Sequence, residues 1–238
     1  MEQPARPVIL IPAFDPDARL VALVRELRRD FPRIVLVDDG STRGREELAA
    51  AVEAGAEKLL VHPENRGKGA ALKTGFAYLL AAAGESPDVI TADADGQHTP
   101  ADIRKIAAGL RERRHGLVLG VRAFAGRVPF RSRFGNFWTR WFFFLLTGLF
   151  VRDTQTGLRG IPGPLLPRVA ALPGARYEYE MVMLADARHH EEPPLQVPIE
   201  TVYLDGNAAS HFSPLKDTVR IYRALFSFRF GGRGKGRS

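Results

Sequence analysis

The chain has 238 residues, 45% of them hydrophobic, and a formal net charge of +7, which is typical of one large globular domain or of one domain with an appendage. It contains no cysteine, so disulfides and thiolate metal sites are excluded and a reducing compartment is expected. We expect neither a signal peptide nor a membrane span, because the first residues lack an apolar stretch and the longest apolar run, 141–151, is too short.

Strands and helices are expected to alternate through the first half of the chain. Apolar runs predict strands at 8–11, 34–37, 59–61, 89–92 and 117–120. Helical spacing of apolar residues predicts helices at 18–31, 45–53, 69–83 and 101–113. Strands separated by single helices indicate an α/β fold with a mostly parallel sheet, in which ligands bind beyond the carboxyl ends of the strands. This rule places residues 12–15, 38–41 and 93–97 along one rim.

The most informative segment is 89–100, in which an apolar strand leads into Asp93 and Asp95. Alternate residues of an extended chain point the same way, so both carboxylates can reach one edge of a pocket, with Gln97 offering a neutral oxygen two residues later. Hard oxygens suit Mg²⁺ or Mn²⁺ bound to the phosphates of a substrate. The alternative is a solvated acidic turn that caps a helix starting at Pro100, with Thr99 as the N-cap.

Two further segments of the rim indicate a phosphate-containing ligand. Asp38 and Asp39 leave a strand and meet a glycine, with Ser41 and Thr42 available to cap the next helix. An acidic N-cap is the alternative there. At 65–75, two glycines flank Lys68 at the start of a helix, so that backbone and ammonium can approach an anion. A flexible turn is the alternative for this segment, which lacks the spacing of a P-loop.

Positive charge is concentrated at the C-terminus, where residues 216–238 hold seven basic side chains and one acidic one. This distribution indicates a local anionic partner, either nucleic acid or lipid. Residues 213–230 predict a basic amphipathic helix, and the glycine-rich residues 231–238 are expected to be disordered. Arginines flank the aromatic segment 137–146, which predicts either a buried core helix or an interfacial helix at a membrane.

Taken in order, these segments resemble glycosyltransferase family 2, the inverting nucleotide-sugar transferases with a GT-A type fold. Residues 12–15 are similar to the family's opening Pro-Ala-Tyr-Asn, with Phe14 and Asp15 as departures, and residues 37–41 match Val-Asp-Asp-Gly-Ser. Residues 93–100 match Asp-Ala-Asp-Gly-Gln-His-x-Pro. Segments 120–122, 131–136, 153–159 and 177–181 look like the polyprenyl-phosphate subgroup, which includes dolichol-phosphate mannosyltransferase.

The resemblance implies a role for each matching residue on the donor side. Pro12, Ala13 and the Asp38–Asp39 pair would line the nucleotide-sugar pocket, with Asp39 at the nucleobase. Asp93 would face the ribose and phosphates, while Asp95 and Gln97 would hold Mg²⁺ or Mn²⁺ on the donor diphosphate. Arg122 would assist at the phosphates. Asp153 and Glu180 would organise the acceptor side or act as a base.

The resemblance also implies an acceptor site and an overall organisation. The acceptor phosphate would be bound by Arg131, Arg133, Asn136, Ser210 and His211, although His211 also fits a purely structural role. A GT-A domain would cover residues 1–212, with a donor half at about 7–122 and an acceptor half at about 123–212. The C-terminal helix would lie at the membrane interface.

The function implied is metal-dependent transfer of a sugar from a UDP- or GDP-sugar to undecaprenyl or dolichyl phosphate. The enzyme would be cytoplasmic and peripheral at the inner face of the cell membrane, with a partner membrane protein or an oligomer left open. One alternative is a soluble glycosyltransferase acting on a hydroxyl acceptor. A remote one is a nonenzymatic nucleic-acid binder that uses the basic tail, which is not favoured because residues 1–215 show no nucleic-acid motif.

Overall fold

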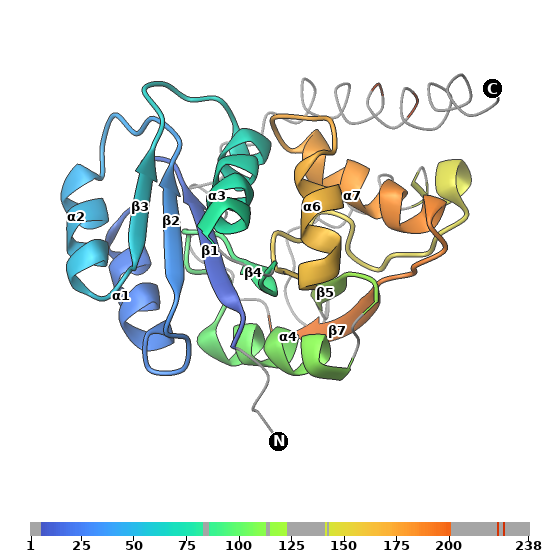
Figure 1. The fold of residues 1–238 in the computed structure, drawn as a ribbon, viewed down its shortest axis with the longest axis horizontal. Coiled ribbons are helices and arrows are strands. Elements are labelled where there is room, and N and C mark those ends of the chain that lie inside the picture. Colours follow the sequence, from blue (N-terminus) through green and yellow to red (C-terminus); the bar gives the residue numbers. More distant parts are fainter. Residues whose placement is uncertain are drawn as a thin grey trace.

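Seven strands form a single sheet in the order β3-β2-β1-β4-β6-β5-β7 (Figure 1). The computed structural model describes residues 6–82, 86–112, 115–122, 141, 143–200, 223 and 226. The strands are β1 (Val8–Ala13), β2 (Ile34–Asp38), β3 (Lys58–Val61), β4 (Val89–Thr91), β5 (Val118–Arg122), β6 (Arg159–Ile161) and β7 (Leu195–Ile199).

Most neighbouring strands are parallel, and β6 is the exception. The pairs β1–β2, β2–β3, β1–β4 and β5–β7 are parallel, whereas β6 runs antiparallel between β4 and β5. The predicted mostly parallel sheet is therefore confirmed. The register pairs Ala13 with Asp38 and Asp38 with Val61, so β1, β2 and β3 end at the same edge.

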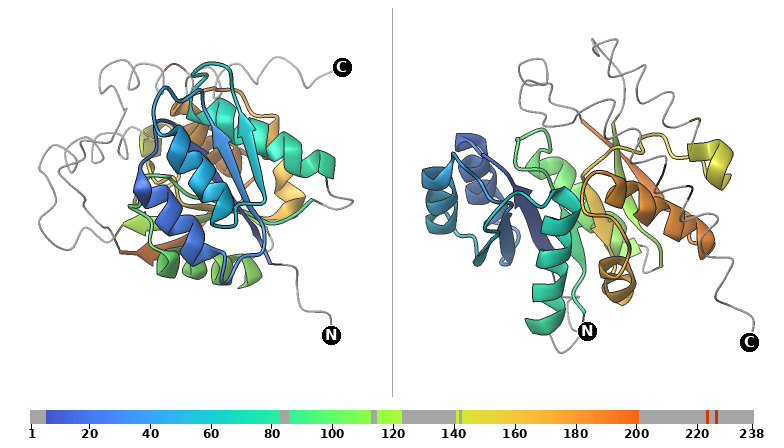
Figure 2. Two further views of the ribbon diagram at one scale, coloured as in Figure 1. Left: turned by 90° about the vertical axis from the view of Figure 1, so that its left-hand side faces the viewer. Right: turned by 90° about the horizontal axis from the view of Figure 1, so that it is seen from above.

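Helices cover both faces of the sheet. They are α1 (Ala18–Leu27), α2 (Arg45–Glu53), α3 (Lys68–Ala82), α4 (Pro100–Glu112), the 3₁₀ turn η1 (Gly163–Leu165), α6 (Leu166–Ala170) and α7 (Glu178–His189). Helices α1, α2 and α4 pack on one face, and α3, α6 and α7 pack on the other (Figure 2). Alternate residues of β1 divide between these two cores: Val8 and Leu10 face α3, while Ile9 and Ile11 face α1.

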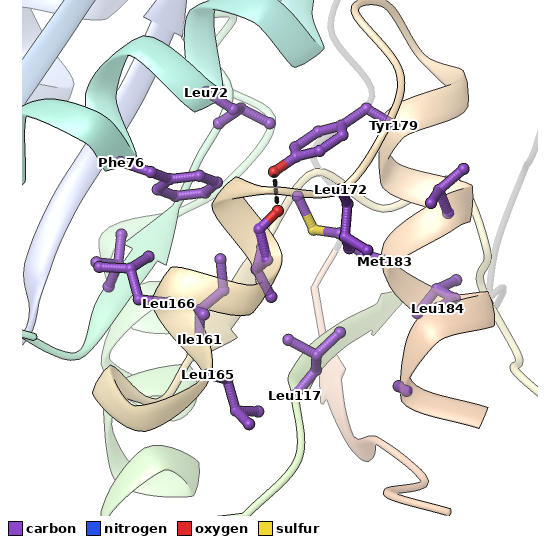
Figure 3. Packing of buried hydrophobic residues seen from close by; sticks show 14 of the residues in the cluster. Leu72, Phe76, Leu117, Ile161, Leu165, Leu166, Leu172, Tyr179, Met183 and Leu184 are labelled. Atoms are coloured by element: carbon purple, nitrogen blue, oxygen red, sulfur yellow. Dashed lines mark hydrogen bonds between the residues drawn. The ribbon is translucent and has the colours of Figure 1, made fainter. Parts of the chain in front are cut away.

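The core beside α3 is closed by residues of the second half of the chain (Figure 3). Tyr179 of α7 is fully buried against Leu72 and Phe76 of α3, and its hydroxyl donates to the carbonyl of Val169 at 2.7 Å. Burial raises the pKa of Tyr179, so its hydroxyl stays protonated as a donor. The contact fixes the start of α7, and with it Glu180, against the donor half.

Several predicted bounds and contacts differ in the structure. The helix predicted to run to residue 31 ends at Leu27, although Phe31 still packs in the core. Ser41 and Thr42 do not cap α2, whose N-cap is Gly44 with no side-chain hydrogen bond. Strand β4 ends at Thr91, and residues 94–96 form a turn. The alternation of an extended chain is therefore the wrong reason for the proximity of Asp93 and Asp95.

The sheet joins the two halves predicted from the sequence, since β5 of the first half pairs with β6 and β7 of the second. The predicted domain end at 212 and the tail at 231–238 lie outside the described residues. Of the predicted helix at 213–230, the structure describes only Arg223 and Phe226, both helical. Within the described part of the chain, none of the helices has the length and apolar character that a membrane span requires.

Candidate active site

The rim predicted from the sequence exists, at the carboxyl ends of β1, β2 and β4. Ala13 is buried and Pro12 is half-buried at the end of β1, and the backbone N–H of Asp39 donates to the carbonyl of Ala13 at 2.8 Å. The side chain of Asp38 accepts a hydrogen bond from the backbone N–H of Ser41 at 2.9 Å. The first bond joins the ends of β1 and β2, and the second fixes the loop that follows β2.

Asp15 ties the loops after β1 and β2 to each other. Its backbone has a φ of +48°, and its side chain accepts from the backbone N–H groups of Thr42 and Arg43 at 2.8 and 2.9 Å. Burial would raise the pKa of this carboxyl, but the hydrogen bonds from Arg43 and Thr42 outweigh burial and lower it. The aspartate at position 15, where the family has Asn, therefore holds the two loops together. The side chain of Asp15 is already hydrogen-bonded within the protein.

A partly buried ion cluster lies beside this rim, where Lys68 joins the two halves of the chain. Its ammonium Nζ lies 2.6 Å from Oδ1 of Asp93, after β4, and 3.0 Å from Oε1 of Glu180, on α7. The side chains of Lys68 and Glu180 are 17% and 6% exposed. His98 lies 3.3 Å from the other oxygen of Asp93. Three residues predicted separately are thus in direct contact.

Lys68 and Asp93 stay charged within the cluster. Burial alone would lower the pKa of Lys68, but Asp93 and Glu180 outweigh it and raise the pKa. Burial would likewise raise the pKa of Asp93, but Lys68 and His98 outweigh it and hold that pKa below the usual range. Asp93 is therefore an acceptor, not a proton donor, near neutral pH.

Asp95 and Gln97 lie in the turn that follows Asp93. The backbone N–H of Gln97 donates to Oδ1 of Asp95 at 3.0 Å, and Gly96 has a left-handed φ of +76°. Burial and the nearby charge of Asp93 raise the pKa of Asp95. Thr99 caps α4 through Asp102, which donates its N–H to Thr99 Oγ1 at 3.1 Å. The helix cap that was the alternative interpretation of segment 89–100 is therefore present, but Asp95 takes no part in it.

Gly157 allows the close approach of Asp93 and Lys68. A Cβ atom at this position would lie 2.4 Å from Oδ2 of Asp93 and 2.6 Å from Nζ of Lys68. We expect Gly157→Ala to push the two charged groups aside, to lower the free energy of unfolding by about 1–2 kcal/mol and to reduce turnover at least about tenfold. Denaturant unfolding and steady-state kinetics measure the two effects. Unchanged turnover would contradict the assignment of the ion pair to the active site.

Arg122 and Asp153 form a second ion pair, between the end of β5 and the loop before β6. Nε and a terminal nitrogen of Arg122 donate to the two carboxylate oxygens of Asp153 at 2.5 and 3.1 Å. Asp153 is fully buried and also accepts from the backbone N–H of Gln155 at 3.2 Å. Such a bidentate pair fixes the guanidinium plane, so Asp153 orients Arg122.

Arg159 supports the cluster and was given no role from the sequence. It is 1% exposed, and its guanidinium donates to the backbone carbonyls of Thr156, Glu180 and Thr154 at 2.9, 2.5 and 3.4 Å. Burial lowers the pKa of Arg159, while Glu180 and Asp153 act against that shift. The sequence does carry a signal for this role, which is an arginine inside the apolar run 158–161. A charge buried there needs several partners.

The predicted acceptor residues Arg131, Arg133, Asn136, Ser210 and His211 lie outside the described residues. Within the described part of the chain, no three acidic or histidine side chains group together as metal ligands. A cation at Asp95 would therefore take its remaining ligands from Gln97, from water and from a bound substrate.

Comparison with known proteins identifies the family. Residues 8–164 match the sequence profile of glycosyl transferase family 2. The chain belongs to glycosyl transferase family 2. A protein of Methanocaldococcus jannaschii described as uncharacterized is 31% identical over 205 residues, which cover 83% of this chain and 82% of that protein. A UDP-N-acetylglucosamine–dolichyl-phosphate N-acetylglucosaminyltransferase of Methanococcus voltae is 29% identical over 240 residues, covering 91% of this chain and 94% of that enzyme.

Solved structures confirm the GT-A fold of this family 2 glycosyltransferase. Glucosyl-3-phosphoglycerate synthase from Mycobacterium tuberculosis, solved with Mn²⁺, UDP and phosphoglyceric acid, has a TM-score of 0.70 and 18% identity over 98% of this chain and 80% of that one. Mannosyl-3-phosphoglycerate synthase from Rubrobacter xylanophilus has a TM-score of 0.63 and 17% identity, over 98% and 77%. The charged cluster therefore belongs to a glycosyltransferase.

Proposed function

We propose that this glycosyltransferase transfers a sugar, with inversion, from a nucleotide-sugar to a polyprenyl phosphate. The observation that carries the proposal is the partly buried cluster of Lys68, Asp93 and Glu180, which brings the donor rim into contact with helix α7 of the second half. The relative in Methanococcus voltae, whose name gives dolichyl phosphate as its acceptor, supports this acceptor class and a UDP-linked donor.

The donor would lie along the rim. Pro12, Ala13 and Asp38 line the base and ribose end, where the buried Asp39 faces the nucleobase. Asp93 and Lys68 lie toward the phosphates, 2.6 Å from each other. When the diphosphate binds, Lys68 is the cation that it meets, and Asp93 and Glu180 hold this ammonium in place.

The residues around Asp95 fit a divalent ion. Lys68 and Arg159 supply two positive charges beside three carboxylates, those of Asp93, Asp95 and Glu180, so one negative charge is left in excess. Asp95 and Gln97 offer the hard oxygens that Mg²⁺ and Mn²⁺ prefer. Bound there, the ion would supply positive charge against the departing nucleoside diphosphate. The Mn²⁺ and UDP in the mycobacterial structure support this assignment.

The reaction is a single in-line displacement. A phosphate oxygen of the acceptor forms a bond to the anomeric carbon as the bond from that carbon to the donor phosphate breaks, and the electron pair leaves with the nucleoside diphosphate. Arg122, oriented by Asp153, donates to phosphate oxygens near the bond that breaks. The acceptor phosphate is already ionised at neutral pH, so no strong general base is required. Glu180 and Asp153 then organise Lys68 and Arg122.

The acceptor phosphate would be bound by Arg131, Arg133, Asn136, Ser210 and His211, as the family resemblance implies. These residues frame the described segment 143–200 on both sides in the sequence. The two arginines among them match the charge of a phosphate monoester.

We place the lipid at an exposed aromatic surface. Trp141, Phe144, Leu145 and Phe150 are 46%, 36%, 76% and 53% exposed, and Phe144 makes edge contacts with Trp141 and Phe150 at 6.1 and 6.4 Å between ring centroids. Phe143 of the same helical stretch is fully buried, which makes the stretch amphipathic. This helical stretch, yellow in Figure 1, lies at the opposite end of the molecule from α1 and α2. Such a surface suits peripheral binding at the inner face of the cell membrane.

Replacing Trp141 and Leu145 together by Ser should weaken binding to vesicles that contain anionic lipid. Two such side chains contribute about 2–3 kcal/mol on leaving water, so the partition coefficient should fall at least about tenfold. Co-sedimentation measures it. The matched control replaces Val52 and Val61, which are 40% and 64% exposed, by Ser and should leave binding unchanged. Equal binding by both double variants would contradict the membrane surface.

The function itself is tested by offering UDP- and GDP-sugars, starting with UDP-N-acetylglucosamine, with Mg²⁺ or Mn²⁺ and undecaprenyl or dolichyl phosphate. Release of nucleoside diphosphate together with a glycosylated lipid supports the proposal. If the enzyme transfers sugar only to hydroxyl acceptors in solution, the proposed lipid acceptor is wrong, whereas the proposed donor site still stands.

A further inference from the structure

A buried hydrogen-bonded chain connects Asp39 to helix α3 through His62. Nδ1 of His62 lies 2.8 Å from Oδ1 of Asp39, and Nε2 lies 2.9 Å from the hydroxyl of Thr74. The side chains of His62 and Asp39 are 4% and 5% exposed. The carboxylate of Asp39 accepts from the ring N–H at Nδ1, and Nε2 is the ring nitrogen that faces the hydroxyl of Thr74.

Asp39 is also the anchor of the loop that leads to Lys68. Its Oδ1 accepts from the backbone N–H of Arg66 at 2.9 Å, and its Oδ2 accepts from the N–H of Gly67 at 2.8 Å. Lys68 follows directly, as the first residue of α3. The carboxylate that the proposed function assigns to the nucleobase thus also holds the backbone that leads into Lys68, the residue assigned to the phosphates.

The loop has little room to take another course. At Gly40, which has a φ of +74°, an added Cβ would lie 2.3 Å from the carbonyl carbon of Glu64. The backbone N–H of His62 also donates to the carbonyl of Asp38 at 2.9 Å. Residues 62–67 therefore pack closely against the end of β2. The His62 ring lies between that end and α3.

We infer that His62 is a positioning residue for the donor, because it fixes the Asp39 carboxylate on the amides of Arg66 and Gly67. The inference rests on the proposed function, in which Asp39 and Lys68 meet the two ends of the nucleotide-sugar. His62 touches no reacting atom. Its loss therefore weakens donor binding, which raises KM, while the turnover of bound donor is retained.

Two isosteric substitutions separate the two hydrogen bonds of His62. In His62→Asn the amide nitrogen lies near the position of Nδ1 and can still donate to Asp39. In His62→Gln the amide lies near the position of Nε2, so the contact to Thr74 is kept and the one to Asp39 is lost. Asn is smaller than Gln by one methylene, so a general packing loss would be larger in His62→Asn, which is the opposite of the order expected from the hydrogen bonds.

We expect the donor KM of His62→Gln to rise about tenfold while its kcat stays within about twofold of the wild type. The donor KM of His62→Asn should stay within about twofold. Steady-state kinetics with varied nucleotide-sugar measures both constants, and melting temperatures verify that both variants are folded. Equal KM values for the two variants, or a loss confined to kcat, would overturn the inference.

Hydrogen exchange tests the loop without any substrate. The amides of Arg66 and Gly67 should exchange at least about tenfold faster in His62→Gln than in His62→Asn, because only the first loses the anchor. Equal exchange rates would also overturn the inference. If the wild-type protein used no nucleotide-sugar, the proposed function would fail, and the exchange rates would still decide whether His62 positions Asp39.

Discussion

Replacing Asp95 by Asn should lower turnover at least about a hundredfold, because a neutral amide holds a divalent ion on the donor diphosphate far less well. The fold should be retained. Burial and Asp93 raise the pKa of Asp95, so its ionised form opposes folding as pH rises through that value, and Asn removes this cost. We therefore expect a melting temperature at pH 7.5 equal to or above that of the wild type.

A matched control for this variant is Asp30→Asn. Asp30 is 41% exposed and pairs with Arg104 at 2.7 Å, far from the rim. Its replacement should leave turnover unchanged. The kinetics should be measured across a range of Mn²⁺ concentrations, since a weakened site is partly restored by more metal. Near-normal transfer by Asp95→Asn at low Mn²⁺ would remove Asp95 from the metal site.

Replacing Lys68 by Met should lower the free energy of unfolding by about 3 kcal/mol, because it leaves Asp93 and Glu180 without their shared cation. The value is at the lower end for buried pairs because Asp93 is 29% exposed. Turnover should also fall at least about a hundredfold, since the donor phosphates lose their ammonium. Denaturant unfolding and steady-state kinetics measure the two losses.

The pH dependence of the Lys68→Met deficit identifies its cause. In the wild type the lowered pKa of Asp93 contributes stability that is present above its unfolded value of 3.8 and is lost as pH falls below it. The stability deficit of the variant should therefore be full at pH 7 and shrink in acid. A deficit independent of pH would indicate lost packing, not an unpaired charge.

Lys105→Met is the control with the same chemistry at another place. Lys105 is 42% exposed and lies 2.8 Å from Oδ1 of the buried Asp102. Asp102 keeps hydrogen bonds from the hydroxyl of Thr99 and the N–H of Glu200 at 2.8 and 3.1 Å. We expect a loss below about 1 kcal/mol and unchanged turnover.

The donor rim could be predicted because it depends on local patterns. Apolar runs ending in Asp38 and Asp93 indicate strands with polar ends, and parallel topology brings those ends together. The shape of the 94–96 turn could not be predicted, because a glycine such as Gly96 can adopt either an extended conformation or the left-handed one seen in the structure.

Contacts between the two halves of the chain could not be predicted from the sequence. Lys68 and Glu180 are 112 positions apart, and no local pattern links them. His62 follows an apolar strand and Arg159 lies in an apolar run, and neither sequence context reveals the partners of the side chain. Strand β6, three residues long and antiparallel, is likewise defined by its neighbours β4 and β5 and not by its own composition.

The antiparallel strand β6 has a consequence for how this enzyme can diversify. The chain leaves the sheet at Arg122 and returns at Arg159 in the neighbouring strand, where Arg159 pairs with Leu119, so the two ends of segment 123–158 are held in adjacent strands. The entropy of closing such a segment changes only slowly with its length. The part of the segment before Asp153 can therefore change in length without redesign of the sheet, whereas Asp153 and Gly157 near its end are fixed by their contacts with Arg122, Asp93 and Lys68.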